Sequence, residues 1–294
     1  MIVIIENGGI GNQIFQYFFC KRIARKKEKI YLLGFDDLKK LIDDNQLCFL
    51  ISRNNILYKI LFRFKWRFDK LIFKYKIFNF IYEDSKLIKD DIFNAKGLFS
   101  LVTYVTGFFQ KEHFIEKKIL NDFKIKNYLL EKARKSISII TNNYNAKIIF
   151  IHLRGRDYKF WPSKKLSAIL PLKWYIKCIN KFKLIYKDEK LIFIFFSDDK
   201  KLFFKKKFFN TNYIFIKQNL LNNFLMMSFC DGGVLSASTY SWWPAFFSFS
   251  KDKKKIFFAP KYWAGHRRKE YFPEDFKYSS FLKYVDVSKS DYKL

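Results

Sequence analysis

The segment "IVIIENGGIGNQIFQYFFC", residues 2–20, begins with four apolar residues, passes through a glycine-rich stretch and ends in an apolar stretch of helical length. Short runs of β-branched residues are typical of buried strands. Glycines after a strand let the backbone approach a ligand, and the helix that follows offers free N–H groups in its first turn. The segment therefore predicts a strand, a turn and a helix. Taken alone, it fits a ligand-binding loop and an ordinary strand–helix turn equally well.

The glycines of this segment match neither of two common phosphate-binding motifs. The dinucleotide fingerprint requires glycine at its first, third and sixth positions; Gly9 and Gly11 fit, but Ile14 occupies the sixth. The P-loop pattern fails as well, because no Gly-Lys-Ser/Thr follows. The amides of Asn12 and Gln13 can donate and accept hydrogen bonds at the start of the helix. They slightly favour a binding role for the loop.

Further short apolar runs are predicted as buried strands, with segments of helical length between several of them. The strands are expected at residues 30–33, 148–151, 191–196, 213–216, 233–235 and 256–259, and the helices at 12–26, 172–186 and 220–229. Strands that alternate with helices indicate an α/β fold with mainly parallel sheets.

The chain has 294 residues, enough for two domains of ordinary size. The alternation of strands and helices is most regular over residues 147–260, whereas residues 36–145 are richer in helical pattern and polar breaks. The polar stretch "TNNYNAK", residues 141–147, interrupts the apolar pattern. We therefore predict an N-terminal domain over residues 1–144 and a C-terminal domain over residues 145–294.

The composition is that of a globular, strongly basic protein. Half of the residues are hydrophobic, and 57 Lys and Arg against 27 Asp and Glu give a net charge of +30. Such a charge attracts nucleic acid, anionic membrane surfaces or phosphorylated substrates, and does not choose among them. The segment "KILFRFKWRFDKLIFKYK", residues 59–76, interleaves Phe and Leu with Lys and Arg, like a helix on an anionic membrane. A surface helix with a solvated basic face fits it at least as well.

The cysteines indicate a reduced, cytosolic protein. Their spacing matches neither metal-ligand motifs nor a dense disulfide framework. They are Cys20, Cys48, Cys178 and Cys230. The start of the chain lacks the pattern of a signal peptide, and no apolar stretch approaches the roughly 18 residues of a membrane-spanning helix.

The segment "IIFIHLRGRDY", residues 148–158, places polar side chains at the end of an apolar strand. Open α/β sheets bind ligands at this end of their strands. Arg154 and Arg156 suit bidentate phosphate contact, and an arginine can neutralise a departing diphosphate without a metal. His152 fits a binding role or a structural one, hydrogen-bonded to neighbouring backbone.

Two later segments place hydroxyls and carboxylates after strands. In "LSASTYSWWPAFF", residues 235–247, hydroxyls crowd a strand-to-helix junction, where they can cap the helix or help to hold phosphate. In "FIFFSDDKK", residues 193–201, Asp198 and Asp199 can accept hydrogen bonds from a base or ribose, or cap a helix. No Asp-x-Asp metal motif occurs in the chain.

Taken together, these segments resemble the bacterial α-1,2-fucosyltransferase family, glycosyltransferase family 11. The matches are a Gly-Gly-x-Gly-Asn-Gln opening at Gly8 to Tyr17, "GFFQKEHF" from Gly107, the motif from His152 to Tyr158, Ser-Asp-Asp at Ser197 to Asp199, and Ser-x-Ser-Thr-aromatic-Ser-Trp-Trp at Ser236 to Trp243. They cover the chain from end to end in the family's order. One departure stands out: the family usually has Arg-Arg-Gly-Asp, whereas this chain has Arg154-Gly155-Arg156-Asp157.

The resemblance implies two Rossmann-type domains facing a cleft, as in the GT-B fold, and a metal-independent, inverting transfer of L-fucose from GDP-β-L-fucose. The C-terminal domain would bind the GDP-sugar, with the N-terminal domain on the acceptor side and the last segment packing back on it. Arg154 would neutralise charge on the β-phosphate, and Asp157 would act as the base or orient an arginine. The donor-binding residues expected are His152, Arg154, Arg156, Asp198, Ser236, Ser238, Thr239, Tyr240, Gly9, Gly11, Asn12 and Gln13.

The expected partners are the donor and a glycan acceptor. The acceptor would be an oligosaccharide or lipid-linked glycan, as in lipopolysaccharide assembly, and a basic surface suits an enzyme at the inner face of the inner membrane. No cofactor and no specific nucleic acid are expected. The alternatives are another GDP-sugar donor, a basic nucleic-acid-binding protein, or a relative that has lost catalysis through the exchanged arginine.

Overall fold

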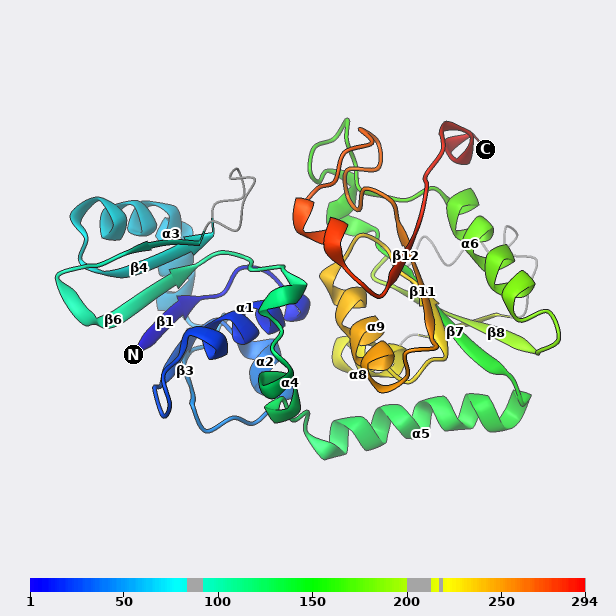
Figure 1. Cartoon of the computed structure of the whole chain (residues 1–294), viewed down its shortest axis with the longest axis horizontal. Coiled ribbons are helices and arrows are strands. Elements are labelled where there is room, and N and C mark those ends of the chain that lie inside the picture. The colour runs from blue at the N-terminus through cyan, green and yellow to red at the C-terminus, as the bar shows by residue number, and fades with distance from the viewer. Residues whose placement is uncertain (84–91, 200–212, 217–218, 294) are drawn as a thin grey trace. The chain divides into compact units, whose positions relative to one another are not determined.

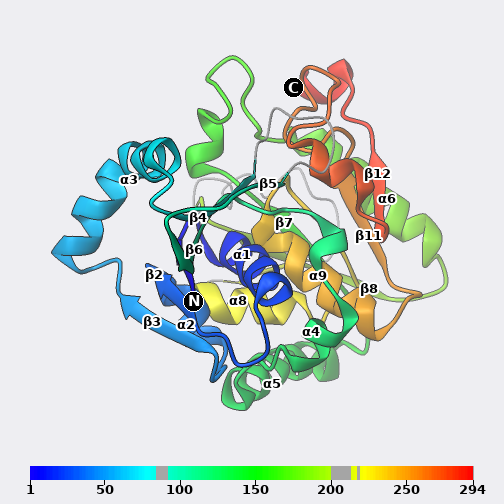
Figure 2. The ribbon, with the colours of Figure 1, turned by 60° about the vertical axis from the view of Figure 1, so that its left-hand side comes forward.

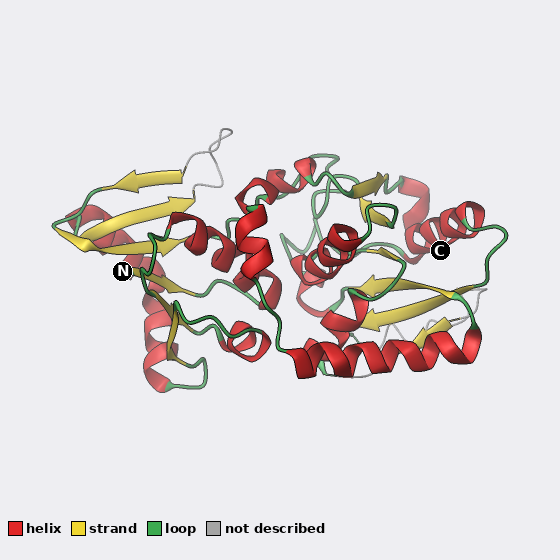
Figure 3. Ribbon diagram, turned by 60° about the horizontal axis from the view of Figure 1, so that its bottom comes forward, coloured by secondary structure: helices red, strands yellow, loops and turns green. Residues whose placement is uncertain are grey.

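The computed structural model describes residues 1–83, 92–199, 213–216 and 219–293. The chain forms two compact units, Met1–Lys126 and Asn127–Leu294. In the described part of the chain, each unit has a six-stranded sheet with helices packed on it (Figures 1 and 3). The predicted fold class, α/β with two Rossmann-type units, is confirmed.

The first unit is built on a sheet of order β3-β2-β1-β6-β4-β5, in which every pairing is parallel except that of β4 with β5. Its elements are β1 (Ile2–Ile5), α1 (Ile10–Ile23), β2 (Ile30–Leu33), α2 (Asp36–Leu41), β3 (Leu47–Ile51), α3 (Ile56–Tyr75), β4 (Phe78–Glu83), β5 (Ile92–Ala95), β6 (Phe99–Thr106), a 3-10 turn (Glu112–Phe114) and α4 (Lys117–Asp122). Helix α1 is buried on most of its surface, which explains its almost continuous apolar sequence.

The second unit has the sheet order β12-β11-β10-β7-β8-β9, and all of its pairings are parallel. Its elements are α5 (Asn127–Tyr144), β7 (Lys147–Leu153), α6 (Leu172–Ile185), β8 (Leu191–Ser197), β9 (Tyr213–Phe215), α8 (Leu220–Met227), β10 (Gly232–Val234), α9 (Thr239–Lys251), β11 (Ile256–Pro260), β12 (Leu282–Val285), and 3-10 turns at Arg156–Lys159, Glu274–Tyr278 and Lys289–Tyr292. Trp174, Cys178 and Phe182 recur every four residues on α6 and are fully buried against the sheet.

The strands predicted from continuous apolar runs are all present, but the structure contains others that the sequence pattern did not indicate. They are β3, β4, β5, β6 and β12. Four of these lie within residues 36–145, where the richer helical pattern corresponds to α2, α3, α4 and α5 but the strands between them were not indicated. In β6 the first three residues are exposed, and β12 alternates buried Leu282 with exposed Lys283. A strand that is only partly covered keeps polar residues, and therefore shows no continuous apolar run.

The boundary between the units also differs from the predicted position at residues 144 and 145. Helix α5 belongs to the second unit, because Ala133, Ile137 and Ile140 are buried on a helix that packs against α8. The polar stretch that suggested a linker is the end of this helix and the turn into β7. The last 3-10 turn, Lys289–Tyr292, packs on α6 within the second unit.

Candidate active site

The second sheet brings together three segments that are far apart in the sequence. Its strand order reverses between β7 and β10, which are paired neighbours, and β8 lies on the other side of β7. Ligands of open α/β sheets bind outside the carboxyl ends of the strands at such a reversal. Arg154 directly follows β7, Asp198 follows β8, and Ser236 lies just beyond β10. The arginine, carboxylate and hydroxyl segments predicted separately therefore meet at one edge of the sheet.

Arg154 is held between two carboxylates at this edge. One terminal nitrogen lies 2.8 Å from Asp198 Oδ2, and the other donates to Asp157 Oδ1 at 2.9 Å. Its guanidinium also lies 5.2 Å from the centre of the Tyr158 ring. The side chain keeps 27% of its surface exposed. A guanidinium that is fixed in direction but still accessible is suited to bidentate contact with a phosphate group.

Asp198 organises the backbone and side chains of three consecutive residues. Besides its pair with Arg154, its Oδ1 accepts a hydrogen bond from Gly155 N at 2.7 Å, and its carbonyl oxygen accepts one from Arg156 Nε at 2.7 Å. The sequence left open whether Asp198 contacts a base or ribose or caps a helix. In this structure its polar groups bond to the loop after β7, and we infer that they position Arg154.

The exchanged glycine and arginine are accommodated by the local geometry. A Cβ atom on Gly155 would lie 2.5 Å from Asp199 Cβ, so no larger residue fits there without movement. Arg156 adopts a φ of 31°, in the region that glycine adopts most easily, at the position where the family pattern has glycine. In this chain, glycine therefore occupies the crowded position 155, and an exposed arginine occupies position 156, where φ is positive.

Asp157, the predicted base, is 61% exposed and contacts Arg154. This contact supports the alternative that the sequence left open, in which Asp157 orients the arginine. Neighbouring Lys159 forms an ion pair with Asp199 at 3.0 Å. The Arg154–Asp157 pair lies within the turn after β7, and the Lys159–Asp199 pair joins this turn to the end of β8.

His152 is enclosed at the end of β7. Its Nδ1 lies 2.7 Å from Ser236 Oγ, and its carbonyl oxygen accepts a hydrogen bond from Tyr175 OH at 3.2 Å. Burial, and secondarily the charge of Arg154, lower the pKa of His152 to about 3. The imidazole is therefore neutral at physiological pH and joins β7 to β10. Because the unfolded chain takes up this proton near pH 6.5, the folded state loses stability as the pH falls from 6.5 toward 3.

The N-terminus of α9 is capped by the predicted hydroxyl segment. Ser238 is the N-cap, and its Oγ accepts from Tyr240 N at 3.3 Å. Thr239 is the first helical residue and is partly exposed. Tyr158 donates to the carbonyl oxygen of Ala237 at 2.7 Å, which links this helix start to the loop of Arg154. Tyr240 donates to the carbonyl oxygen of Leu220 at 2.6 Å and lies beside His152, with ring centres 5.3 Å apart.

In the first unit, the glycine-rich loop lies at the corresponding reversal of strand order, between β1 and β6. Gly8 has a φ of 99°. Asn12 Nδ2 donates to Asn7 O at 3.1 Å, and its Oδ1 accepts from Gln110 Nε2 at 2.9 Å. Gln16 Nε2 donates to Gly107 O at 2.8 Å. The opening motif and the "GFFQ" segment are therefore bonded to each other. Gly9 is exposed, whereas Gly11 is buried.

Gln13 has a different position from the one expected of a ligand-binding residue. It is fully buried; its Oε1 accepts from Leu38 N at 2.9 Å and its Nε2 donates to Gly8 O at 3.4 Å. The amide therefore joins the glycine-rich loop to α2. We infer that its role is to position the loop.

We expect Gln13→Leu to lower the free energy of unfolding by about 1–3 kcal/mol, because the buried N–H of Leu38 loses its acceptor. Urea denaturation measures the change. Asn142→Leu, at an exposed position of α5, is the matched control and should unfold as the wild type does. An unchanged midpoint for Gln13→Leu would contradict the positioning role.

An ion pair between buried Glu6 and partly exposed Arg53, which the sequence pattern did not indicate, supports the same loop. Glu6 directly follows β1, is buried, and accepts a hydrogen bond from Tyr58 OH at 2.7 Å. Arg53 Nε lies 3.2 Å from Glu6 Oε1, and the Arg53 side chain also donates to Gly8 O at 2.8 Å and to Asp37 at 3.1 Å. In the sequence, Glu6 could have been noticed as a carboxylate at the end of a strand. Arg53 lies 47 positions later in the chain, and no sequence pattern marks it as the partner of Glu6.

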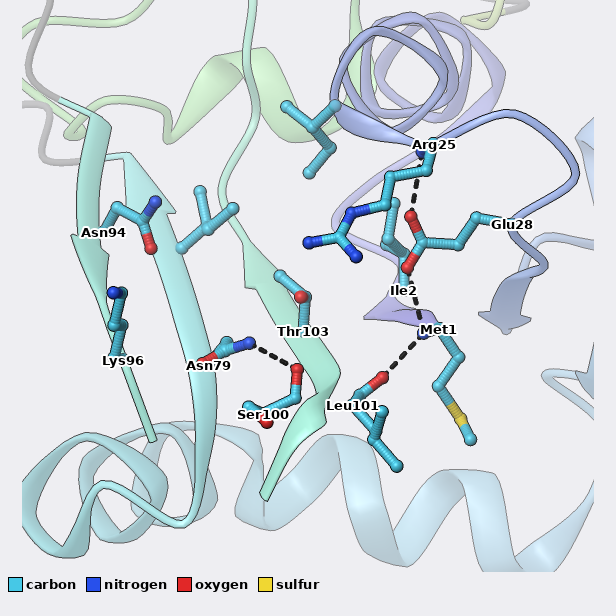
Figure 4. Close-up of a pocket in the computed structure, with 12 residues that line it drawn as sticks. Met1, Ile2, Arg25, Glu28, Asn79, Asn94, Lys96, Ser100, Leu101 and Thr103 are labelled. Atoms are coloured by element: carbon cyan, nitrogen blue, oxygen red, sulfur yellow. Dashed lines mark hydrogen bonds and ion pairs between the residues drawn. The ribbon is translucent and has the colours of Figure 1, made fainter. Parts of the chain in front are cut away.

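A pocket of about 350 Å³ in the first unit lies away from these loops (Figure 4). It is lined near the start of β1, where the amino group of Met1 contacts Glu28 at 2.9 Å and Leu101 O at 2.7 Å. Ligands of parallel sheets bind at the opposite, carboxyl ends of the strands. We therefore do not place the active site there. Among the residues that the structure describes, no group of three or more His, Cys, Asp or Glu side chains is arranged to hold a metal ion.

Comparison with known proteins agrees with the resemblance seen in the sequence. Residues 37–279 match the model of glycosyl transferase family 11. The O-antigen biosynthesis glycosyltransferase WbnK of Escherichia coli is 27% identical over 302 aligned residues, which cover 89% of this chain and 95% of WbnK. Among solved structures, fucosyltransferase NodZ from Bradyrhizobium aligns with a TM-score of 0.46 at 12% identity, over 83% of this chain and 91% of NodZ. POFUT1 in complex with GDP aligns with a TM-score of 0.48 at 13% identity, over 83% of this chain and 92% of POFUT1. Because the family model matches most of the length of this chain, the chain belongs to glycosyl transferase family 11.

Proposed function

We propose that this glycosyltransferase moves L-fucose from GDP-β-L-fucose to a sugar hydroxyl of a bacterial surface glycan, with inversion and in α-1,2 linkage. The observation that carries the proposal is the guanidinium of Arg154, held by Asp198 and Asp157 at the reversal of the second sheet. The five ordered motifs support fucose as the sugar. The similarity to an O-antigen glycosyltransferase supports a surface glycan as the acceptor, free or lipid-linked.

In the proposed reaction, the bond between C1 of fucose and the β-phosphate oxygen breaks, and the acceptor oxygen bonds to C1 from the opposite face. GDP leaves with the electron pair of the broken bond. Arg154 stabilises the negative charge that grows on the β-phosphate, which is greater in the transition state than in the bound donor. We place the N-terminus of α9, with Ser238 and Thr239, on the same diphosphate, because the positive end of the helix dipole favours anions. No metal is required in this scheme.

The acceptor hydroxyl must lose its proton, and Asp157 is the carboxylate that we assign to this step. It lies one turn from Arg154 and keeps most of its surface exposed, so an acceptor can reach it. Its hydrogen bond from Arg154 also orients the guanidinium. Contact of Arg154 with the diphosphate would release the carboxylate for the proton.

A panel of GDP-sugars tests the proposal, with release of GDP as the readout and linkage analysis of the product. We expect GDP-fucose to be the donor used, and EDTA to leave the rate unchanged. GDP should also raise the melting temperature, because a ligand that binds the folded state stabilises it. Use of another GDP-sugar in place of GDP-fucose would contradict the assigned donor. Salt-sensitive DNA binding without any response to GDP would favour the nucleic-acid-binding alternative.

A further inference from the structure

Helix α3 (Ile56–Tyr75) turns only a narrow side toward the protein. Tyr58 and Ile72 are its buried residues, and it packs along β4 (Figures 1 and 2). Asp69, its one acidic residue, faces the sheet, where it accepts hydrogen bonds from Tyr104 OH at 2.7 Å and Thr106 Oγ1 at 3.3 Å. The helix therefore has no carboxylate on its outer surface.

Two stripes of side chains run along that outer surface. Members of each stripe follow one another at three or four positions, which places them on one side of a helix. The apolar stripe consists of Leu57, Ile60, Phe64, Phe68, Leu71 and Tyr75, and the basic stripe consists of Lys59, Arg63, Arg67, Lys70 and Lys74. Exposed fractions in the apolar stripe range from 38% for Phe68 to 59% for Leu57. A surface helix normally buries its apolar side, and this one exposes it.

Aromatic residues border the basic stripe on its other side. Trp66 is 67% exposed, and the ammonium of Lys70 lies 3.7 Å from the centre of its ring. Tryptophan with both an apolar body and a polar N–H is enriched where membrane meets water. Basic side chains can lie along such rings and keep their charges in water or among phosphates.

The exposed apolar surface continues beyond the end of α3. Leu98 N donates to Lys76 O at 2.8 Å and Phe99 N donates to Ile77 O at 2.9 Å, which places the start of β6 beside the end of the helix. Leu98 and Phe99 are 81% and 61% exposed. The helix and this strand start therefore present apolar groups together, on the same unit.

We propose that α3 docks the protein on an anionic lipid bilayer, lying in the plane of the headgroups. The apolar stripe would enter the boundary of the acyl chains, and the basic stripe would contact lipid phosphates beside it. Charge complementarity selects this occupant, because α3 has no carboxylate on its outer surface and, within the described residues, no acidic side chain forms an ion pair with the five cations of the basic stripe. Nucleic acid would satisfy the cations but leave the apolar stripe in water. An interface between two copies would bring the two basic stripes together, which like charges oppose.

This mode of attachment requires no membrane-spanning segment. In the part of the chain that the structure describes, no helix combines the length and the apolar character needed to span a bilayer. The attachment does not depend on which sugar is transferred. Lipid binding without GDP-fucose therefore tests it separately from the proposed function.

Sedimentation with vesicles tests the proposal in the full-length protein. We expect binding to vesicles of phosphatidylethanolamine and phosphatidylglycerol, and little binding to pure phosphatidylcholine. A basic-stripe variant (Arg63→Gln, Arg67→Gln, Lys70→Gln) and an apolar-stripe variant (Ile60→Ser, Phe64→Ser, Leu71→Ser) should each bind at least about tenfold more weakly. The control Lys132→Gln, Lys135→Gln, Lys181→Gln removes three exposed charges from α5 and α6 and should bind as the wild type does. Unchanged melting temperatures would show that the variants fold.

Quenching by brominated lipid provides a second readout. Phe64→Trp, which places a tryptophan in the apolar stripe, should add fluorescence that is quenched in anionic vesicles, whereas the wild type, whose Trp66 lies across the basic stripe, should be quenched less. Absence of vesicle binding by the wild type would overturn the proposal. Loss of binding in the basic-stripe variant with full binding in the apolar-stripe variant would overturn it too, because the surface would then attract any polyanion. Dimerisation abolished by the apolar-stripe variant, without lipid binding, would assign the surface to a second copy of the chain.

Discussion

Arg154→Ala is expected to lower kcat by about 10²–10³-fold, the usual effect of removing one group that stabilises transition-state charge. The reason is its place at the carboxyl end of β7, where two carboxylates fix its direction while part of its surface stays exposed. The melting temperature should change little, because Asp198 keeps the N–H of Gly155 as a donor. Release of GDP from GDP-fucose under saturating donor measures the effect.

Arg154→Lys distinguishes charge from geometry. Lysine supplies a point charge without the planar fork, so we expect partial activity between that of Arg154→Ala and the wild type. Arg156→Ala removes the other arginine of the same loop and tests whether that residue also contributes to transfer. If Arg156 has taken over the second arginine's role, this variant will also lose activity. Full activity of Arg154→Ala would remove the basis of the proposed mechanism.

Gly155→Ala is expected to destabilise the protein by about 1–3 kcal/mol and to reduce activity, because the added methyl has no room. Its Cβ would lie 2.5 Å from Asp199 Cβ and 2.9 Å from Asp199 Oδ2. Relief requires the loop after β7 to move away from the end of β8. That movement separates Gly155 N from Asp198 and loosens the carboxylate that holds Arg154. Urea unfolding and GDP release measure the two effects.

Gly9→Ala is the control for the stability measurement, because no atom lies within 4 Å of a Cβ built at that exposed glycine. We expect its unfolding midpoint to stay close to that of the wild type. If the Gly155→Ala variant is as stable as the Gly9→Ala variant, the loop after β7 can accommodate the added methyl group without loss of stability. The exchanged glycine would then be a neutral difference from the family pattern.

The sequence by itself determined the α/β class, most of the buried strands and the residues around which the second-unit site is built. A strand covered on both faces needs a continuous apolar run, and its polar side chains then gather at its ends. This is why the segments ending at Arg154, Asp198 and Ser236 could be recognised without a structure. The same reasoning missed β6 and β12, since partly exposed strands carry polar residues and lose that pattern.

Only the tertiary structure decided which of the chemically suitable side chains are exposed to a ligand and which form hydrogen bonds inside the protein. Gln13 and His152 have the hydrogen-bonding groups of binding residues, yet both are buried and bonded to neighbouring elements. The pair of Glu6 and Arg53 depends on a contact between residues distant in the chain, which no local pattern encodes. The exposure of the apolar stripe on α3 is likewise decided by packing, because an amphipathic sequence does not specify which of its faces a neighbour will cover.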